Sequence, residues 1–130
     1  MNSAGQASVN GTPPRISIVD DNASVRAALK NLMRSVGFSV ETFGSAEEFL
    51  VSAELHDTEC LILDLYLPGM NGFELQQLLL NRRPKIPIIF ITAHADELTR
   101  SRALKDGAVE MLAKPVRRDA LFNAIQSAIR

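Results

Sequence analysis

The chain has 130 residues, the usual size of one domain and long enough to bury a hydrophobic core. Hydrophobic residues make up 46% and charged residues 22%, as in an ordinary globular protein, and a net charge of −1 argues against direct nucleic-acid binding through a basic surface. No apolar run approaches the ~20 residues of a membrane-spanning helix, and the first residues lack the apolar stretch of a signal peptide, so we expect no membrane partner.

The first stretch, residues 1–14, consists of small, polar and turn-forming residues. This composition offers too little apolar surface to fold, so we expect a flexible N-terminal tail, followed by a single domain over residues 15–130. The one cysteine, Cys60, lies in an apolar run, and a single cysteine excludes an internal disulfide. We expect a buried, reduced thiol in a cytoplasmic protein.

Five short apolar runs follow, at residues 16–19, 38–43, 60–63, 86–91 and 109–113. Runs of this length with few polar positions are typical of strands buried on both faces of a parallel sheet. Helical signals lie between and after them, namely an apolar stripe that stops at Gly37, capping-box pairs of Ser45 with Glu48 and of Asn71 with Glu74, a cap at Asp96 before a helix that ends at Gly107, and the apolar spacing of Leu121, Phe122, Ile125 and Ile129. Strand and helix therefore alternate five times, which predicts an open parallel α/β sheet with helices on both sides.

Residues with useful chemistry stand at the ends of four of these predicted strands. They are Asp20 and Asp21 after the first strand, Asp64 after the third, Thr92 after the fourth, and Lys114 with Pro115 after the fifth. The carboxyl ends of parallel strands meet at one edge of a sheet, which is where ligands bind in such folds. Three carboxylates, a hydroxyl and an ammonium group are therefore expected to converge there.

Each of these residues alone has an ordinary structural explanation. Asp21 could cap a helix, Asp64 could open a turn, Thr92 could be a strand former, and Lys114 could be a surface lysine. Their placement at the same edge favours a shared site instead.

The charges of this predicted site call for a cation. Two carboxylates ~4 Å apart repel by about 4 kcal/mol at an effective dielectric constant of ~20, and Lys114 supplies only one positive charge. Mg²⁺ prefers a few carboxylates together with water and a phosphate oxygen, whereas zinc would need a His or Cys ligand set that is absent from these strand ends. A carboxylate beside Mg²⁺ and an ammonium group is suited to attack on phosphorus.

Four motifs carry a resemblance to a known family: IVDD at 18–21, LILDLYLPGMNG at 61–72, ITA at 91–93 and AKP at 113–115. In order and spacing they resemble the receiver domains of two-component response regulators, over residues 15–130. The resemblance implies a doubly wound, five-stranded parallel sheet in the flavodoxin-like order 2-1-3-4-5 with five helices. The chain looks most like receivers fused to a C-terminal helix-turn-helix DNA-binding domain, and we expect that effector domain to be absent from this chain.

The resemblance implies a phosphorylation-dependent signalling switch. Asp64 would be the phosphoacceptor, receiving the group from a phosphohistidine of a sensor histidine kinase. Asp20, Asp21, Asp64 and the backbone carbonyl of Tyr66 would hold Mg²⁺. The domain would act as a catalyst only in its own phosphorylation and dephosphorylation.

The resemblance also implies how the signal leaves the site. Thr92 would hydrogen-bond a phosphoryl oxygen, Lys114 would pair with the phosphoryl group, and the Lys114–Pro115 peptide bond would be cis. The last two helices and the last strand would form the output face, which would regulate an effector, in transcription. A phosphorylation-dependent homodimer through that face stays open, since no residue indicates it.

Two positions depart from the family pattern. Met111 stands where receivers usually have Tyr or Phe, and Val116 stands where they usually have Phe. Met is flexible and offers no two-position ring, so we expect phosphorylation to be normal and the conformational response of the output face to be blunted or rerouted. Tyr66 and His94 flank the predicted site, either as simple surface residues or as modulators of the lifetime of the phosphoryl group.

Three alternative functions fit the sequence less well than the switch. An aspartyl-phosphate hydrolase on the same fold would want a second acid where Tyr66 stands. A flavodoxin-like cofactor binder would want a phosphate-binding loop where the chain has Asp20, Asp21 and Asn22, whose charge repels phosphate in the absence of a metal. A pseudo-receiver that is never phosphorylated would not need the full set of residues.

Overall fold

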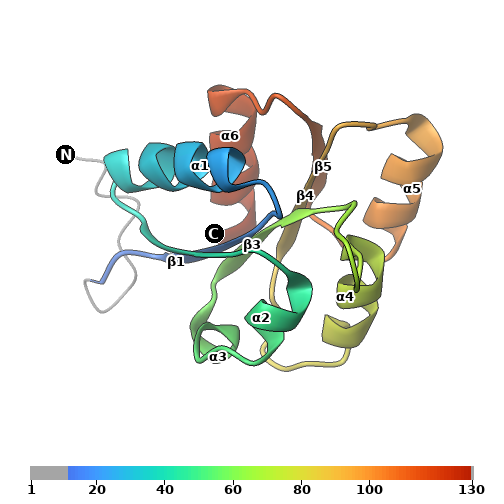
Figure 1. Ribbon diagram of the computed structural model, residues 1–130, viewed down its shortest axis with the longest axis horizontal. Helices are drawn as coiled ribbons and strands as arrows, with labels where there is room; N and C mark the ends of the chain where they lie inside the picture. Colours follow the sequence, from blue (N-terminus) through green and yellow to red (C-terminus); the bar gives the residue numbers. More distant parts are fainter. Residues whose placement is uncertain (1–11, 130) are drawn as a thin grey trace.

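Five strands and six helices alternate along residues 12–129, the part of the chain that the computed structural model describes (Figure 1). In chain order they are β1 (Arg15–Val19), α1 (Ala23–Ser35), β2 (Ser39–Phe43), α2 (Ala46–Leu50), α3 (Glu54–Asp57), β3 (Cys60–Asp64), α4 (Gly72–Leu79), β4 (Ile88–Thr92), α5 (Glu97–Lys105), β5 (Glu110–Ala113) and α6 (Arg118–Ile129).

The strands form one parallel sheet in the order β2-β1-β3-β4-β5, which confirms the predicted fold class and strand order. In this register Val19 lies opposite Leu63, and Thr92 lies opposite Ala113. The last residues of β1, β3, β4 and β5 therefore share one edge of the sheet, and the residues that follow them are brought together.

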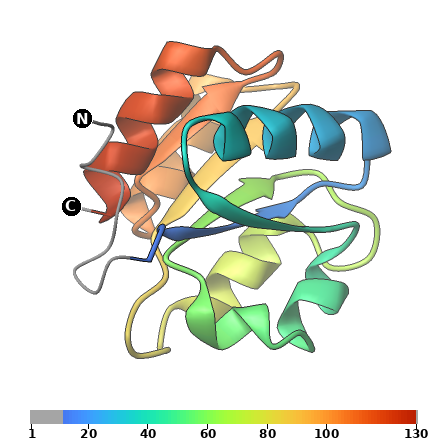
Figure 2. The same ribbon diagram turned by 90° about the vertical axis from the view of Figure 1, so that its left-hand side faces the viewer.

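Alternation along the buried strands divides the core between the two faces of the sheet. In β3, Leu61 and Leu63 belong to a cluster with the buried residues of α2 to α5, whereas Cys60 and Ile62 belong to a cluster with those of α1 and α6. Figures 1 and 2 show this arrangement, with α1 and α6 on one face and α2 to α5 on the other. Burial on both faces explains why the central strands read as continuous apolar runs.

Between β2 and β3 the structure has two short helices where one was predicted, so the number of helices is six rather than five. Ser45 caps α2 by accepting a hydrogen bond from the Glu48 amide. Helix α2 ends at Leu50. Just beyond it, the Ser52 hydroxyl donates to the Phe49 carbonyl at 2.7 Å, and the Ser52 amide donates to the same oxygen. A side chain that bonds a nearby carbonyl in this way competes with continuation of a helix.

The fourth strand begins at Ile88 and ends at Thr92, rather than covering residues 86–91 as predicted. Pro87 has no amide hydrogen to donate to a neighbouring strand, although its carbonyl accepts from Leu61 at 2.9 Å. The strand therefore starts one residue after the proline.

Helix α5 is anchored mainly by polar contacts. Of its nine residues, all of which the structure describes, only Ala103 is buried. The buried Gln76 amide of α4 donates to the Ala103 carbonyl at 3.1 Å, and the Arg102 guanidinium lies 4.0 Å from the centre of the Phe73 ring on α4. The helix thus contributes little to the hydrophobic core.

The predicted tail falls mostly on residues 1–11, which lie outside the described residues. Pro14, at the end of that segment, is buried, and its carbonyl accepts a hydrogen bond from the Ser39 amide at 3.0 Å. Cys60 is a buried free thiol, and burial raises its pKa to about 12. Among residues 12–129, none of the helices combines the length and the apolar character needed to cross a membrane.

Candidate functional site

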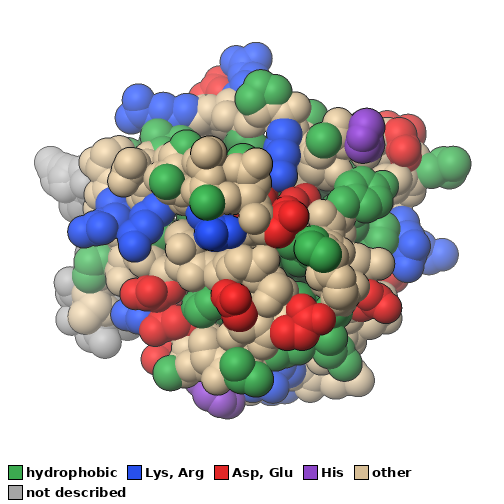
Figure 3. All heavy atoms as spheres, in the orientation of Figure 1, with side chains coloured by type: hydrophobic (Ala, Val, Ile, Leu, Met, Phe, Trp, Pro, Cys, Tyr) green, Lys and Arg blue, Asp and Glu red, His purple; other side chains and the backbone are tan. Residues whose placement is uncertain are grey.

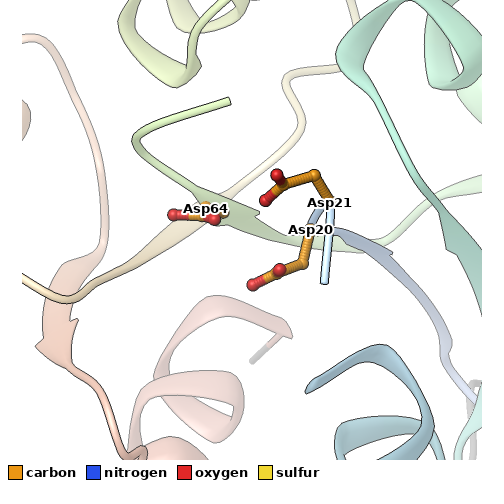
Figure 4. Close-up of side chains that lie close together, drawn as sticks. All are labelled: Asp20, Asp21 and Asp64. Atoms are coloured by element: carbon orange, nitrogen blue, oxygen red, sulfur yellow. The ribbon is translucent and has the colours of Figure 1, made fainter. Parts of the chain in front are cut away.

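Three aspartates from the ends of β1 and β3 meet at the carboxyl edge of the sheet. Asp20, Asp21 and Asp64 each offer one carboxylate oxygen, and these oxygens lie within 4.8 Å of one another. In Figure 4 the carboxyl groups of Asp20 and Asp21 extend from the end of β1 toward the side where Asp64 lies. Asp20 is fully buried and Asp64 is 5% exposed, whereas Asp21 is exposed to solvent. The cluster therefore has two buried members and one that faces water.

Backbone contacts fix the position of Asp20. Its amide donates to the Phe43 carbonyl at 3.1 Å, and its Oδ1 accepts from the Asn22 amide at 2.8 Å. The Arg26 guanidinium, on the first turns of α1, donates to the Asp20 carbonyl at 2.7 Å. The other carboxylate oxygen, Oδ2, lies 2.8 Å from the Lys114 ammonium, yet no group among the described residues makes a hydrogen bond of good geometry to it.

Lys114 connects the ends of three strands. From the end of β5, its ammonium lies 2.8 Å from Asp20 Oδ2 and 3.2 Å from Asp64 Oδ2. The other oxygen of Asp64, Oδ1, accepts from the Tyr66 amide at 3.3 Å. The peptide bond from Lys114 to Pro115 is cis. One positive charge is thus shared between two buried carboxylates.

The environment moves the pKa values of both partners upward. Burial, followed by the negative charge of Asp20, raises the pKa of Asp64, and the contacts with Lys114 and the Tyr66 amide only partly oppose this shift. Burial alone would lower the pKa of Lys114, but its contacts with the carboxylates of Asp20 and Asp64 outweigh burial and raise it. Lys114 is therefore held in its charged form, while an ionised Asp64 is disfavoured in the absence of a further cation.

Thr92, Tyr66 and His94 lie around this cluster. Thr92 is fully buried at the end of β4, its hydroxyl oxygen accepts from the His94 amide at 3.2 Å, and its carbonyl accepts from the Lys114 amide at 2.8 Å. Tyr66 is 55% exposed, and its ring packs edge to face on the His94 ring with 6.3 Å between centroids. The two flanking rings therefore contact each other at the surface.

Met111 and Val116 lie in the apolar packing rather than among the acidic residues. Met111 is 3% exposed and belongs to the cluster on the face covered by α2 to α5, and Val116 packs against the cluster on the other face. Both departures from the family pattern are thus separate from the carboxylates.

Sequence reasoning missed how the segment after β3 is supported. Gly72 begins α4 directly over the end of β3, and its amide donates to the Leu65 carbonyl at 2.8 Å. A Cβ at this position would lie 2.8 Å from the Asp64 carbonyl oxygen, so only glycine permits the approach. The Asn71 cap just before it was a usable signal. The Glu47 carboxylate also accepts from the Met70 amide at 2.9 Å. No sequence pattern indicates this contact, because the two residues are 23 positions apart.

The residues present fit a hard divalent cation. Asp20 offers a carboxylate oxygen within 4.8 Å of oxygens of Asp21 and Asp64, and its buried Oδ2 has the Lys114 ammonium at 2.8 Å but no hydrogen bond among the described residues. Carboxylate oxygens with an open, water-facing side are the ligands that Mg²⁺ prefers. No His or Cys takes part in this cluster, so the donor set does not suit zinc.

Comparison with known proteins connects this site to a family. The response regulator receiver domain family matches residues 16–126. Nodulation protein W of Bradyrhizobium diazoefficiens is 47% identical over 111 residues, covering 85% of this chain and 49% of that protein. The response regulator protein TodT of Pseudomonas putida is 43% identical over 115 residues, covering 88% of this chain and 51% of that protein.

A solved structure extends the likeness to three dimensions. The structure of the response regulator StyR is 47% identical, superposes with a TM-score of 0.81, and covers 89% of this chain and 59% of that chain. The chain spans about half the length of the curated relatives that it matches. The family match and the identity to these relatives show that the chain belongs to the response regulator receiver domains.

Proposed function

We propose that this receiver domain is a phosphorylation-dependent switch that accepts a phosphoryl group on Asp64. The observation that carries the proposal is the convergence of three carboxylates with one ammonium group, which lies 2.8 Å from Asp20 and 3.2 Å from Asp64. An excess of negative charge at a partly open edge suits a divalent cation, which could in turn bind an incoming phosphoryl group, better than it suits a purely structural role.

The chemistry follows from the position of Asp64. An oxygen of its carboxylate attacks phosphorus and forms an acyl phosphate, while the bond from phosphorus to the donor nitrogen of a phosphohistidine breaks and leaves its electron pair on the imidazole. Lys114 is held in its charged form and can neutralise a phosphoryl oxygen. Asp64 contributes as a positioned nucleophile, since phosphoryl transfer depends mainly on placement and on charge stabilisation.

Asp20, Asp21, Asp64 and the Tyr66 carbonyl are the groups that would hold Mg²⁺. When bound, the ion would neutralise charge on the carboxylates and on the transferred phosphoryl oxygens. Asp20 Oδ2 is already buried and aimed at the cluster, and Asp21 faces solvent, so the exposed side of the site stays open to a phosphoryl donor.

After transfer, Thr92 and Lys114 connect the phosphoryl group to the output face. Thr92 is the last residue of β4, and its backbone carbonyl already accepts a hydrogen bond from the amide of Lys114, the first residue after β5. A new hydrogen bond to Thr92 would therefore bias β4, β5 and α5 toward one arrangement of a pre-existing equilibrium. Met111, a flexible residue within β5, would transmit this shift less sharply than a ring.

We also propose the partners of the switch. The phosphoryl donor is a sensor histidine kinase in the cytoplasm, where a lone reduced thiol such as Cys60 is the usual state. The output is an effector that controls transcription, since the chain matches a little over half the length of relatives that include the transcriptional regulatory proteins TdiR of Thauera aromatica and FixJ of Bradyrhizobium diazoefficiens. A homodimer through α5, β5 and α6 is a further candidate for the active form.

Treatment with acetyl phosphate, with and without Mg²⁺, followed by intact-mass measurement, tests the proposal. The wild type should gain one phosphoryl group only with Mg²⁺, and Asp64→Asn should gain none. Asp57→Asn removes the same charge from an exposed position in α3 and should behave as the wild type. A folded wild type that gains no mass would contradict the switch and favour a pseudo-receiver, and a gain retained in Asp64→Asn would place the phosphoryl group elsewhere.

A further inference from the structure

The loop between β3 and α4, residues 65–71, is fixed firmly at its two ends. The Leu65 amide donates to the Ile91 carbonyl at 3.0 Å, and the Gly72 amide donates to the Leu65 carbonyl at 2.8 Å. These bonds close the loop but leave the residues between them to be held by other contacts. The loop carries Tyr66, whose carbonyl is the proposed backbone ligand of the metal.

A carboxylate from another part of the chain holds this loop near its end, next to α4. Glu47, in the first turn of α2, accepts a hydrogen bond from the Met70 amide through Oε2 at 2.9 Å. The same bond lowers the pKa of Glu47, so the carboxylate is ionised at neutral pH. The contact joins α2 to the loop across 23 positions of sequence.

Gly69 has no side chain and so leaves room for the Glu47 carboxylate to reach the Met70 amide. Its φ of +73° belongs to the left-handed region that favours glycine, and a Cβ at this position would lie 2.7 Å from Glu47 Oε2. A side chain at position 69 would therefore both strain the turn and push the carboxylate away. Both the left-handed turn at Gly69 and the nearby Glu47 carboxylate therefore favour glycine at this position.

We propose that Glu47 is a positioning residue for the metal site, acting through the Met70 amide on the loop that carries the Tyr66 carbonyl; this inference rests on the proposed function. A loop that is already held in its bound arrangement loses less conformational freedom when a ligand binds. Removal of the Glu47 carboxylate should therefore weaken Mg²⁺ binding, although Glu47 itself does not touch the ion.

Charge alone is the competing explanation. Acidic side chains gather over α2 and α3 on the face shown in Figure 3, and any of them would attract a cation at long range. Glu48 offers a matched control, because it is the next residue, is exposed, and accepts from the Gly44 amide at 3.0 Å rather than from the loop. Glu47→Gln offers a second one, since it removes the charge but keeps an oxygen that can accept from Met70.

The experiment measures the Mg²⁺ dissociation constant of the unphosphorylated protein by titration of amide chemical shifts, and the hydrogen-exchange rate of the Met70 amide. Glu47→Ala should weaken Mg²⁺ binding by about tenfold, the usual loss when a supporting group of a metal site is removed. The Met70 amide should exchange faster in that variant. Glu47→Gln should lose less affinity, and Glu48→Gln should match the wild type.

Three results would overturn the inference: unchanged affinity in Glu47→Ala, equal losses in Glu47→Ala and Glu47→Gln, or a loss in Glu48→Gln as large as in Glu47→Ala. The last two would assign the effect to charge. Wild type that binds no Mg²⁺ would refute both this inference and the proposed function. Wild type that binds Mg²⁺ but accepts no phosphoryl group would refute only the latter.

Discussion

Replacing Asp64 with Asn should make the metal-free protein more stable. The change removes one of three carboxylates whose oxygens lie within 4.8 Å of one another, and with it the ion pair between Asp64 and Lys114 at 3.2 Å. Burial, and then the charge of Asp20, raise the pKa of Asp64, so its ionised form is less favourable in the folded protein than in the unfolded chain.

The expected size follows from these distances. At an effective dielectric constant of ~20, two carboxylate charges at the 4.8 Å upper limit of their separation repel by about 3.5 kcal/mol. At the same dielectric constant, the pair of Asp64 with Lys114 at 3.2 Å gains about 5 kcal/mol. Repulsion of Asp64 by Asp20 and Asp21 together exceeds that gain by about 2 kcal/mol, and water around the exposed Asp21 reduces the excess. We therefore expect Asp64→Asn to raise the free energy of unfolding by about 1 to 2 kcal/mol.

Urea denaturation in the presence of a chelator provides the assay. The midpoint should rise by an amount on the order of 1 M, given the usual slopes for domains of this size. Mg²⁺ at about ten times its dissociation constant should then stabilise the wild type by about 1.4 kcal/mol. The difference in free energy of unfolding between the wild type and Asp64→Asn should therefore become smaller. Asp57→Asn, at an exposed position, should change stability by less than about 0.5 kcal/mol. An unchanged or lower midpoint in Asp64→Asn without Mg²⁺ would refute the reasoning.

Four further outcomes are expected. Because the folded-state pKa of Asp64 is raised above the ordinary value of 3.8, protonation of Asp64 favours the folded state, and the stability gap between wild type and Asp64→Asn should shrink as pH falls from neutrality toward 3.8 in metal-free urea titrations. A gap independent of pH would contradict this. Tyr66→Asn should shorten the lifetime of the acyl phosphate, measured by the decay of the phosphorylated mass, since a bulky ring limits the access of water; an unchanged half-life would remove that role. Gly72→Ala should lower the free energy of unfolding by about 1 to 3 kcal/mol in urea titrations, because its Cβ would lie 2.8 Å from the Asp64 carbonyl oxygen and 2.9 Å from Leu65 Cα. Equal stability would mean that the backbone can move apart. Met111→Tyr should enlarge the chemical-shift changes of α5 and β5 on phosphorylation, and shifts already as large in the wild type would count against a blunted response.

The sheet could be predicted because burial on both faces leaves a strong mark on the sequence. The central runs that include Cys60 and Ile89 have almost no polar positions, and the strand order is confirmed. Element ends were harder. α3 has four residues and begins without a side-chain cap, so nothing in the sequence marks its start. The start of β4 lies two residues after its predicted position, because the strand begins only after Pro87.

Much of the site could be predicted for a topological reason. Any residue at the carboxyl end of a parallel strand lies at the same edge of the sheet, so strand direction alone brings Asp20, Asp64 and Lys114 together. Contacts that depend on loop geometry could not be predicted in this way. The approach of Glu47 to Met70 requires both the position of α2 and the turn at Gly69, and neither is encoded in local spacing.

The sparse anchoring of α5 has a consequence for how relatives of this domain can diverge. Eight of the nine residues of this helix are not buried, so most substitutions there leave the apolar core intact and cost little stability. The exposed residues of α5, which belong to the proposed output face, can therefore change during evolution while the sheet and the acidic edge stay unchanged. After a gene duplication, two copies could therefore come to differ at this part of the proposed output face before the rest of the fold changes.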